Sequence, residues 1–121
     1  MKKKRIVSAL FAGILVALAF SSPAAWAQAA PQKIEITARR FAYTPGDITL
    51  KKGQPVVLVL KSEDVAHGMR IRELHINLKV KAGGTAEVQF TPEKTGDFVG
   101  HCSVFCGAHH GSMIFRLHVV D

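Results

Sequence analysis

The sequence predicts an all-β domain, a Greek-key β-sandwich of about seven or eight strands that follows an N-terminal signal peptide. Short runs in which apolar and polar residues alternate are separated by turns that contain glycine or proline, a pattern typical of half-buried strands. After the signal peptide, no window of about 11 residues has the periodicity of an amphipathic helix. Together the two observations favour an all-β domain.

Residues 1–27 have the pattern of a secretory signal peptide. The basic segment Lys2–Arg5 precedes the apolar segment Ile6–Phe20, and Ala25–Ala27 supplies small residues at a cleavage site. The apolar segment has 15 residues, fewer than the roughly 20 that span a bilayer. An uncleaved anchor is the alternative. We therefore expect residues 28–121 to act in the periplasm as one domain, without stable membrane insertion.

Most of the net charge of +7 belongs to the signal peptide. Four of the 16 basic residues and none of the nine acidic residues lie in residues 1–27, so the rest of the chain carries +3 (12 basic against nine acidic residues). No basic run with interleaved aromatic residues is present, and the sequence therefore gives no reason to expect nucleic-acid binding.

The first predicted strands lie in segments 34–37 and 48–51, which Pro45-Gly46 separates. Each segment alternates apolar and polar residues and so presents one apolar face. The next strand, Val56–Leu60, is continuously apolar and rich in β-branched residues, as expected of a central strand that is buried on both faces.

The later strands follow further turn signals. Segment 86–90 alternates again after Gly83-Gly84, and a strand from Asp97 leads into Cys102. The last strand begins at about Met113, and its outward residues include Arg116 and His118. Its inward residues are Phe115, Leu117 and Val119.

The segment between the last two strands carries the chemistry. Cys102, Cys106, His110 and Met113 lie within 12 residues, and this combination of thiols, imidazole and thioether suits copper better than any hard cation. Calcium and magnesium are excluded. Zinc accepts two cysteines and two histidines, but it has no normal requirement for a thioether, so Met113 favours copper.

His67 is the upstream histidine that a closed site needs. It follows the central strand and precedes Gly68, so we expect it on a loop at a strand end. In a sandwich the loops at one end cluster. The loop of His67 is therefore expected to meet the loop of residues 102–113.

These residues resemble a known family. Four segments of the chain resemble the CuA domains of cytochrome c oxidase subunit II and of nitrous oxide reductase, which have the cupredoxin fold. The segments are Gly53-x-Pro55-Val56, Asp64-Val65-x-His67-Gly68, Phe90-Thr91-Pro92-x-Lys94-x-Gly96 and Cys102–Met113. The resemblance covers most of the chain after the signal peptide. It implies a copper centre of two ions, a binuclear CuA site that transfers electrons.

The resemblance also implies a role for each ligand. Cys102 and Cys106 would each bridge both coppers as thiolates. An electron shared by two metals and two sulfurs causes little bond-length change on reduction, which suits rapid electron transfer rather than bond chemistry.

The remaining ligands implied by the resemblance complete the two coppers separately. His67 and Met113 would complete one copper. His110 and the backbone carbonyl of Val104 would complete the other.

Two alternatives to this site stay open. Cys102 and Cys106 are the only cysteines, and a pair in an exported protein forms a disulfide by default. Alternatively His109, with His67, Met113 and one cysteine, would form a mononuclear blue-copper site, but the second cysteine is then unexplained.

The resemblance implies a redox partner, namely a cytochrome or a terminal oxidase or reductase. The alternative is a copper-handling protein that delivers copper to an apo-protein for oxidase assembly. Val104 stands where oxidase subunits usually carry an acidic residue, and the only tryptophan is Trp26 in the signal peptide. Phe105 is a conceivable substitute for an aromatic residue at which electrons enter. An enzyme is not expected, because no nucleophile and base form an evident set.

Several other polar residues are interpreted as structural. His101 and His118 are expected on outward strand faces. Arg39 and Arg40 are expected to be solvated charges that protect a strand edge from pairing.

Overall fold

The computed structural model describes residue 13 and residues 30–121. The predicted signal peptide, except for Gly13, and its cleavage site lie outside the described residues. The described part contains nine strands and two short 3-10 turns, and no helix in it is long and apolar enough to cross a membrane. The strands are β1 (Gln32–Arg39), β2 (Ala42–Thr44), β3 (Asp47–Lys51), β4 (Val56–Ser62), β5 (His67–Ile71), β6 (Ile76–Val80), β7 (Thr85–Phe90), β8 (Gly96–His101) and β9 (Ile114–Val120). The turns are η1 (Arg72–Leu74) and η2 (His110–Ser112).

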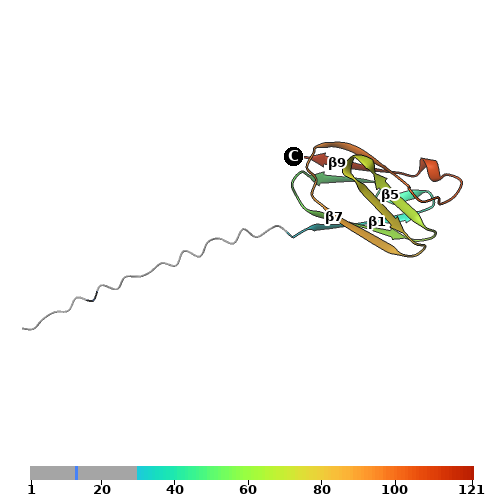
Figure 1. Cartoon of the computed structure of the whole chain (residues 1–121), viewed down its shortest axis with the longest axis horizontal. Coiled ribbons are helices and arrows are strands. Elements are labelled where there is room, and N and C mark those ends of the chain that lie inside the picture. Colours follow the sequence, from blue (N-terminus) through green and yellow to red (C-terminus); the bar gives the residue numbers. More distant parts are fainter. Residues whose placement is uncertain (1–12, 14–29) are drawn as a thin grey trace, which may run out of the picture.

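The nine strands form two sheets, which confirms the all-β sandwich. One sheet has the order β2-β1-β4-β7 and the other the order β3-β9-β8-β5-β6. The chain crosses repeatedly between the sheets, so two of the neighbouring pairs are parallel: β1 with β4 and β3 with β9. Figure 1 shows the strands stacked as two layers.

The predicted alternation places the core between the sheets. On β9 the residues Phe115, Leu117 and Val119 are buried, whereas Arg116 is exposed. The central strand β4 is covered on its second face too, because Val59 is 5 % exposed. On this second face Val57 is half-buried and Lys61 is exposed, so the strand is fully buried on one face and only partly on the other.

The loop of residues 102–113 lies at one end of the sandwich, away from the C-terminus (Figure 1). The turn that precedes β5 reaches the same end, because β5 pairs with β8 through Arg70 and His101. His67 was expected on a loop, but it is the first residue of β5, where it pairs with Val80 of β6. The His67 side chain is fully buried.

Candidate metal centre

Two thiols form the middle of the candidate site. Cys102 follows β8 directly, and Cys106 lies four residues further along the loop. Both side chains are buried free thiols, and their Sγ atoms are 3.5 Å apart. A group formed by the two thiols and His67 has ligand atoms within 4.8 Å of one another. The structure thus brings together residues that are 35 positions apart in the chain.

His67 is held with one ring nitrogen toward the thiols. Its Nδ1 lies 4.0 Å from Sγ of Cys102, and its Nε2 lies 2.6 Å from Oδ1 of Asp64. With the Nε2 proton donated to a carboxylate, the Nδ1 lone pair faces the sulfur. Asp64 therefore selects the tautomer in which Nδ1 can bind a metal.

The turn before β5 sets the position of Asp64. The hydroxyl of Ser62 donates to the carbonyl of Val65, and the Asp64 N–H donates to the Ser62 Oγ (3.3 Å). Such side-chain hydrogen bonds to the backbone fix tight turns. Burial alone would raise the pKa of Asp64, but hydrogen bonds from the Arg40 N–H, the His67 ring and the Val65 N–H outweigh it and hold the pKa at about 2. The carboxylate therefore remains ionised.

The remaining predicted site residues, His110, Met113 and Val104, also lie next to the thiols. Nδ1 of His110 is 3.6 Å from Sγ of Cys106, and Sδ of Met113 is 3.8 Å from the same sulfur. The thiol of Cys102 donates to the carbonyl oxygen of Val104 over 3.1 Å. The structure therefore brings all six predicted site residues together.

Backbone hydrogen bonds fix the shape of the loop. The Cys102 N–H donates to the Met113 carbonyl (3.2 Å) at its base, and the His110 N–H donates to the Gly107 carbonyl (3.1 Å). Gly107 has φ +137°, and a Cβ there would lie 2.9 Å from the ring of Phe41. Only glycine combines this backbone conformation with so close an approach.

Arg40 connects the two halves of the site, which the sequence did not predict. Its backbone N–H donates to Oδ2 of Asp64 (2.8 Å), and its Nε donates to the Cys106 carbonyl (3.0 Å). Arg40 was interpreted as a solvated edge charge, as was Arg39. Both residues are exposed, but the guanidinium of Arg40 has a specific acceptor on the loop. No local sequence signal marks a contact across so many residues.

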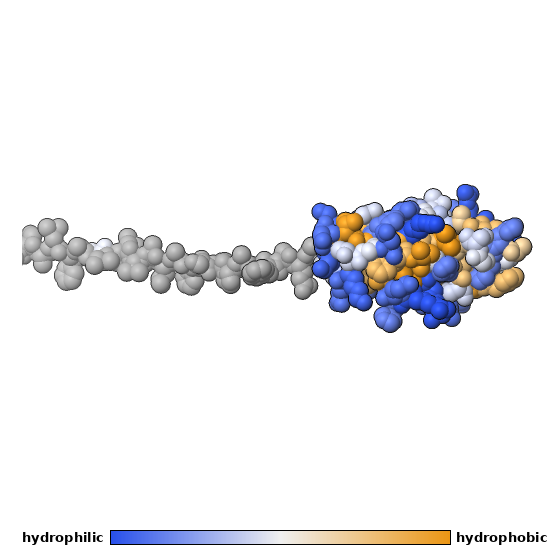
Figure 2. All heavy atoms as spheres, turned by 90° about the horizontal axis from the view of Figure 1, so that it is seen from above, coloured by the Kyte–Doolittle hydropathy of each residue, from blue (hydrophilic) through white to orange (hydrophobic). Residues whose placement is uncertain are grey.

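Two further residues of the loop, His109 and Phe105, lie at the surface. His109 is exposed and packs edge-on against Phe41, with ring centroids 5.2 Å apart. Phe105 is 79 % exposed and packs against the ring of His110. His110, not His109, is therefore the loop histidine beside the thiols. Figure 2 shows apolar residues reaching the surface in the middle of the domain and near the end that carries the loop.

The donor set fits a soft metal ion. Burial, reinforced by the neighbouring Cys102 thiol, raises the pKa of Cys106 to about 11. Without a metal this thiol is protonated at neutral pH, and a metal must displace its proton. Two thiols, two imidazole nitrogens and a thioether, all buried except the half-buried His110, match the preferences of copper rather than those of oxygen-seeking cations.

Comparison with known proteins gives relatives of two kinds. The chain is 37 % identical over 88 residues to the nitrous-oxide reductase of Cupriavidus necator, a match that covers 69 % of this chain and 14 % of the reductase. It is 30 % identical over 80 residues to cytochrome c oxidase subunit 2 of Thermus thermophilus, covering 66 % of this chain and 59 % of that subunit. The chain thus corresponds to only part of each relative.

A solved structure and a family description agree with the architecture. The periplasmic domain of cytochrome oxidase subunit II of Bradyrhizobium japonicum superposes with a TM-score of 0.68 at 19 % identity, covering 74 % of this chain and 84 % of that domain. The family description "Cupredoxin-like domain" matches residues 10–115. The chain belongs to the cupredoxin-like domain family.

Proposed function

We propose that this domain holds a binuclear copper centre and exchanges electrons with a redox protein, namely a cytochrome or a respiratory oxidase or reductase. Six groups would hold the copper. They are the side chains of His67, Cys102, Cys106, His110 and Met113, and the backbone carbonyl of Val104.

The observation that carries the proposal is the pair of buried thiols with an imidazole nitrogen beside each. The two Sγ atoms are 3.5 Å apart, Nδ1 of His67 lies 4.0 Å from Cys102, and Nδ1 of His110 lies 3.6 Å from Cys106. One histidine for each of two adjacent sulfurs is what two metals that share both sulfurs require. A single trigonal site would leave one of these groups unused, and a single tetrahedral site would leave out the thioether of Met113, whose Sδ lies 3.8 Å from Sγ of Cys106.

The chain's own residues prepare the site for rapid electron exchange. When bound, the two coppers supply a one-electron couple that is shared by both metals and both sulfurs. Asp64 orients His67, and Arg40 holds the loop through the Cys106 carbonyl. These contacts, within a close-packed sandwich, limit how far the ligands move when the charge changes.

We propose further that the protein is exported and acts in the periplasm after residues 1–27 have been removed. A solved structure with this fold is described as a periplasmic domain. The N-terminal sequence of the protein isolated from cells tests this part of the proposal. Gln28 is expected as its first residue, and Met1 as the first residue would contradict it.

Copper titration with absorption and electron paramagnetic resonance spectra tests the binuclear site. We expect two coppers per chain that share one unpaired electron, with seven hyperfine lines because the electron couples equally to both nuclei. Cys106→Ser should lose this spectrum, because only one bridging sulfur remains. His109→Ala is the matched control and should retain it, because His109 is exposed and points to Phe41.

The contrary outcomes point to different functions. One copper with four hyperfine lines would overturn the binuclear site in favour of a mononuclear centre. Two coppers that pass rapidly to an apo-acceptor, without reversible electron exchange, would indicate copper delivery. Failure to take up copper, with Cys102 and Cys106 oxidised, would indicate a disulfide.

A further inference from the structure

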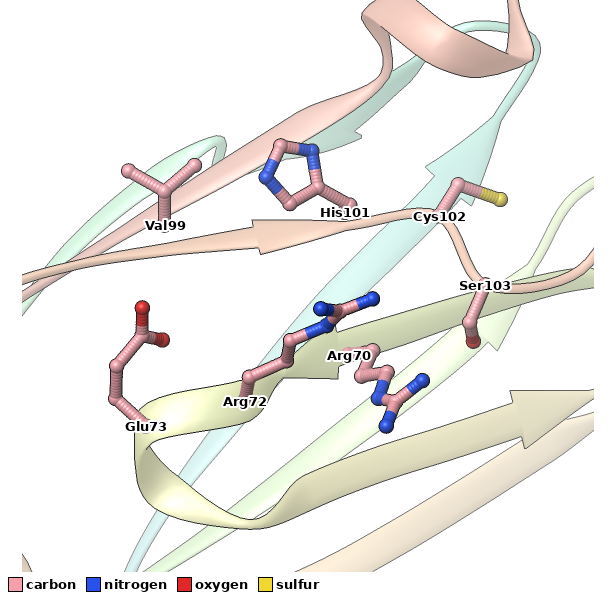
Figure 3. Close-up of a pocket in the computed structure, with 7 residues that line it drawn as sticks. All are labelled: Arg70, Arg72, Glu73, Val99, His101, Cys102 and Ser103. Carbon is pink, nitrogen blue, oxygen red and sulfur yellow. The ribbon is translucent and has the colours of Figure 1, made fainter.

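We propose that the outer face of the five-stranded sheet beside Cys102 docks an acidic surface of a partner protein, an inference that rests on the proposed electron exchange and names the chemistry of its partner. A cleft of about 450 Å³ opens there. Its lining includes the cationic side chains of Arg70 and Arg72, together with His101 and Ser103, and we call it the arginine cleft. Figure 3 shows both arginines beside the end of β8, where Cys102 and Ser103 follow.

The strand register explains why basic groups gather on this face. Arg70 of β5 is the cross-strand partner of His101 of β8, and such partners lie on the same face of a sheet. Arg116 of β9 stands opposite Val99, which also lines the cleft. The basic groups that line the cleft are therefore those of β5, η1 and β8, next to the end that holds the thiols.

The positive charge of the cleft is not neutralised within the molecule. Glu73 is the one carboxylate that lines it. Among the residues that the structure describes, no salt bridge involves Arg70, Arg72 or Arg116.

Two other carboxylates lie on this outer face, Asp47 opposite Arg116 and Asp97 opposite His118. Asp47 and Asp97 both pair with His118, at 2.8 Å and 2.5 Å. The guanidinium groups of the cleft are thus available, and their planar arrangement of donors suits carboxylates.

The surroundings favour a protein surface over a small free anion. Both arginines are exposed rather than enclosed, and Val99 beside them is 41 % exposed. Arginine next to an exposed apolar side chain is typical of protein interfaces. Cys102 lines the cleft, although its sulfur points away from the arginines (Figure 3), so a docked partner would lie beside the residue that carries one of the two thiols. Electron exchange requires such closeness, because its rate falls steeply with distance.

The test measures binding of a glutamate hexapeptide to the reduced, copper-loaded protein by NMR at low salt. We expect the amide signals of residues 70–72 and 101–103 to shift, and added salt to weaken the binding. Arg70→Gln with Arg72→Gln should weaken it by roughly three- to tenfold, because each exposed ion pair contributes modestly. Lys33→Gln with Lys52→Gln removes the same charge at the far end of the sandwich and should change it by less than about twofold.

Two outcomes would overturn the docking proposal. Peptide binding that the arginine substitutions leave unchanged would show that the cleft does not recognise acidic groups. Inorganic phosphate binding in the cleft as tightly as the peptide would make it a site for small anions. If the double variant does not fold, the single variants Arg70→Gln and Arg72→Gln provide the same comparison.

The test also separates this inference from the proposed function. An arginine variant with a normal copper spectrum and unweakened peptide binding contradicts the docking surface alone. A protein that takes up no copper contradicts the electron-exchange proposal, and peptide binding to its reduced, metal-free form still reports on the cleft.

Discussion

Nε of Arg40 lies 3.0 Å from the carbonyl oxygen of Cys106, although 66 residues separate them in the chain. The backbone N–H of the same arginine donates to Asp64, whose other carboxylate oxygen holds His67. One residue thus spans the two segments that carry the candidate ligands. The relative position of His67 and the loop depends on this connection.

Arg40→Ala should therefore loosen the copper loop without unfolding the sandwich. We expect a lower copper affinity, by about tenfold, as for other outer-sphere substitutions at metal sites, and a changed absorption spectrum. Arg39→Ala is the control, because Arg39 is exposed and precedes Arg40 directly. Equal copper affinity in the two variants, measured by competition with a chelator, would contradict the connecting role of Arg40.

Asp64→Ala should weaken copper binding by roughly 10–100-fold, the usual range for losing the carboxylate partner of a ligating histidine. Without the carboxylate, His67 is no longer held in the tautomer that turns its Nδ1 lone pair toward Cys102. Glu63→Ala, in the same turn, removes an exposed carboxylate and should leave the affinity unchanged. Competition with a chelator measures the copper affinity of both variants. An unchanged affinity in Asp64→Ala would contradict the prediction.

Gly68→Ala should disturb the contact between β5 and the loop. A Cβ at Gly68 would overlap the side chain of Ser103 and lie 3.1 Å from the backbone nitrogens of Ser103 and Val104. The side chain can rotate away, but the backbone cannot. We expect a loss of about 1–3 kcal/mol in the free energy of unfolding, as for other overpacked sites.

Gly111→Ala is the matched control for Gly68→Ala, because a Cβ at Gly111 meets no atom within 4 Å. Denaturant unfolding of the two variants measures the difference. Equal free energies of unfolding would show that the approach of β5 to the loop is not tight.

The ion pairs of His118 should make stability depend on pH. Hydrogen bonds from the His118 ring to the carboxylates of Asp97 and Asp47 raise the pKa of His118 above its usual value of 6.5. The stabilisation is therefore fully present below the unfolded-state pKa and is lost as pH rises through the higher folded-state pKa. Unfolding midpoints of the wild type and of His118→Gln should converge as the pH rises from below 6.5 through the raised folded-state pKa. A constant difference between them would contradict this assignment.

The sequence predicted those parts of the fold and site that depend on local patterns. Alternation located β9 and its inward residues Phe115 and Leu117, because burial of one strand face leaves a period of two. The thiol cluster could be predicted because Cys102, Cys106, His110 and Met113 lie within 12 residues of one loop. The placement of His67 within β5 was missed, because a buried polar residue at a strand end interrupts the apolar pattern. The contact of Arg40 with the loop was missed because it depends on tertiary structure.

The position of the 102–113 loop in the chain links metal binding to the completion of the fold. β9 follows the loop directly and lies between β3 and β8. The base of the loop closes through the hydrogen bond from Cys102 to Met113, next to the first residue of β9. The closed base of the loop and the pairing of β9 with β8 and β3 therefore belong to the same part of the fold. An ion that binds the closed loop but not the open chain stabilises the state in which β9 is paired. Copper binding would therefore hold the C-terminal strand in the sheet.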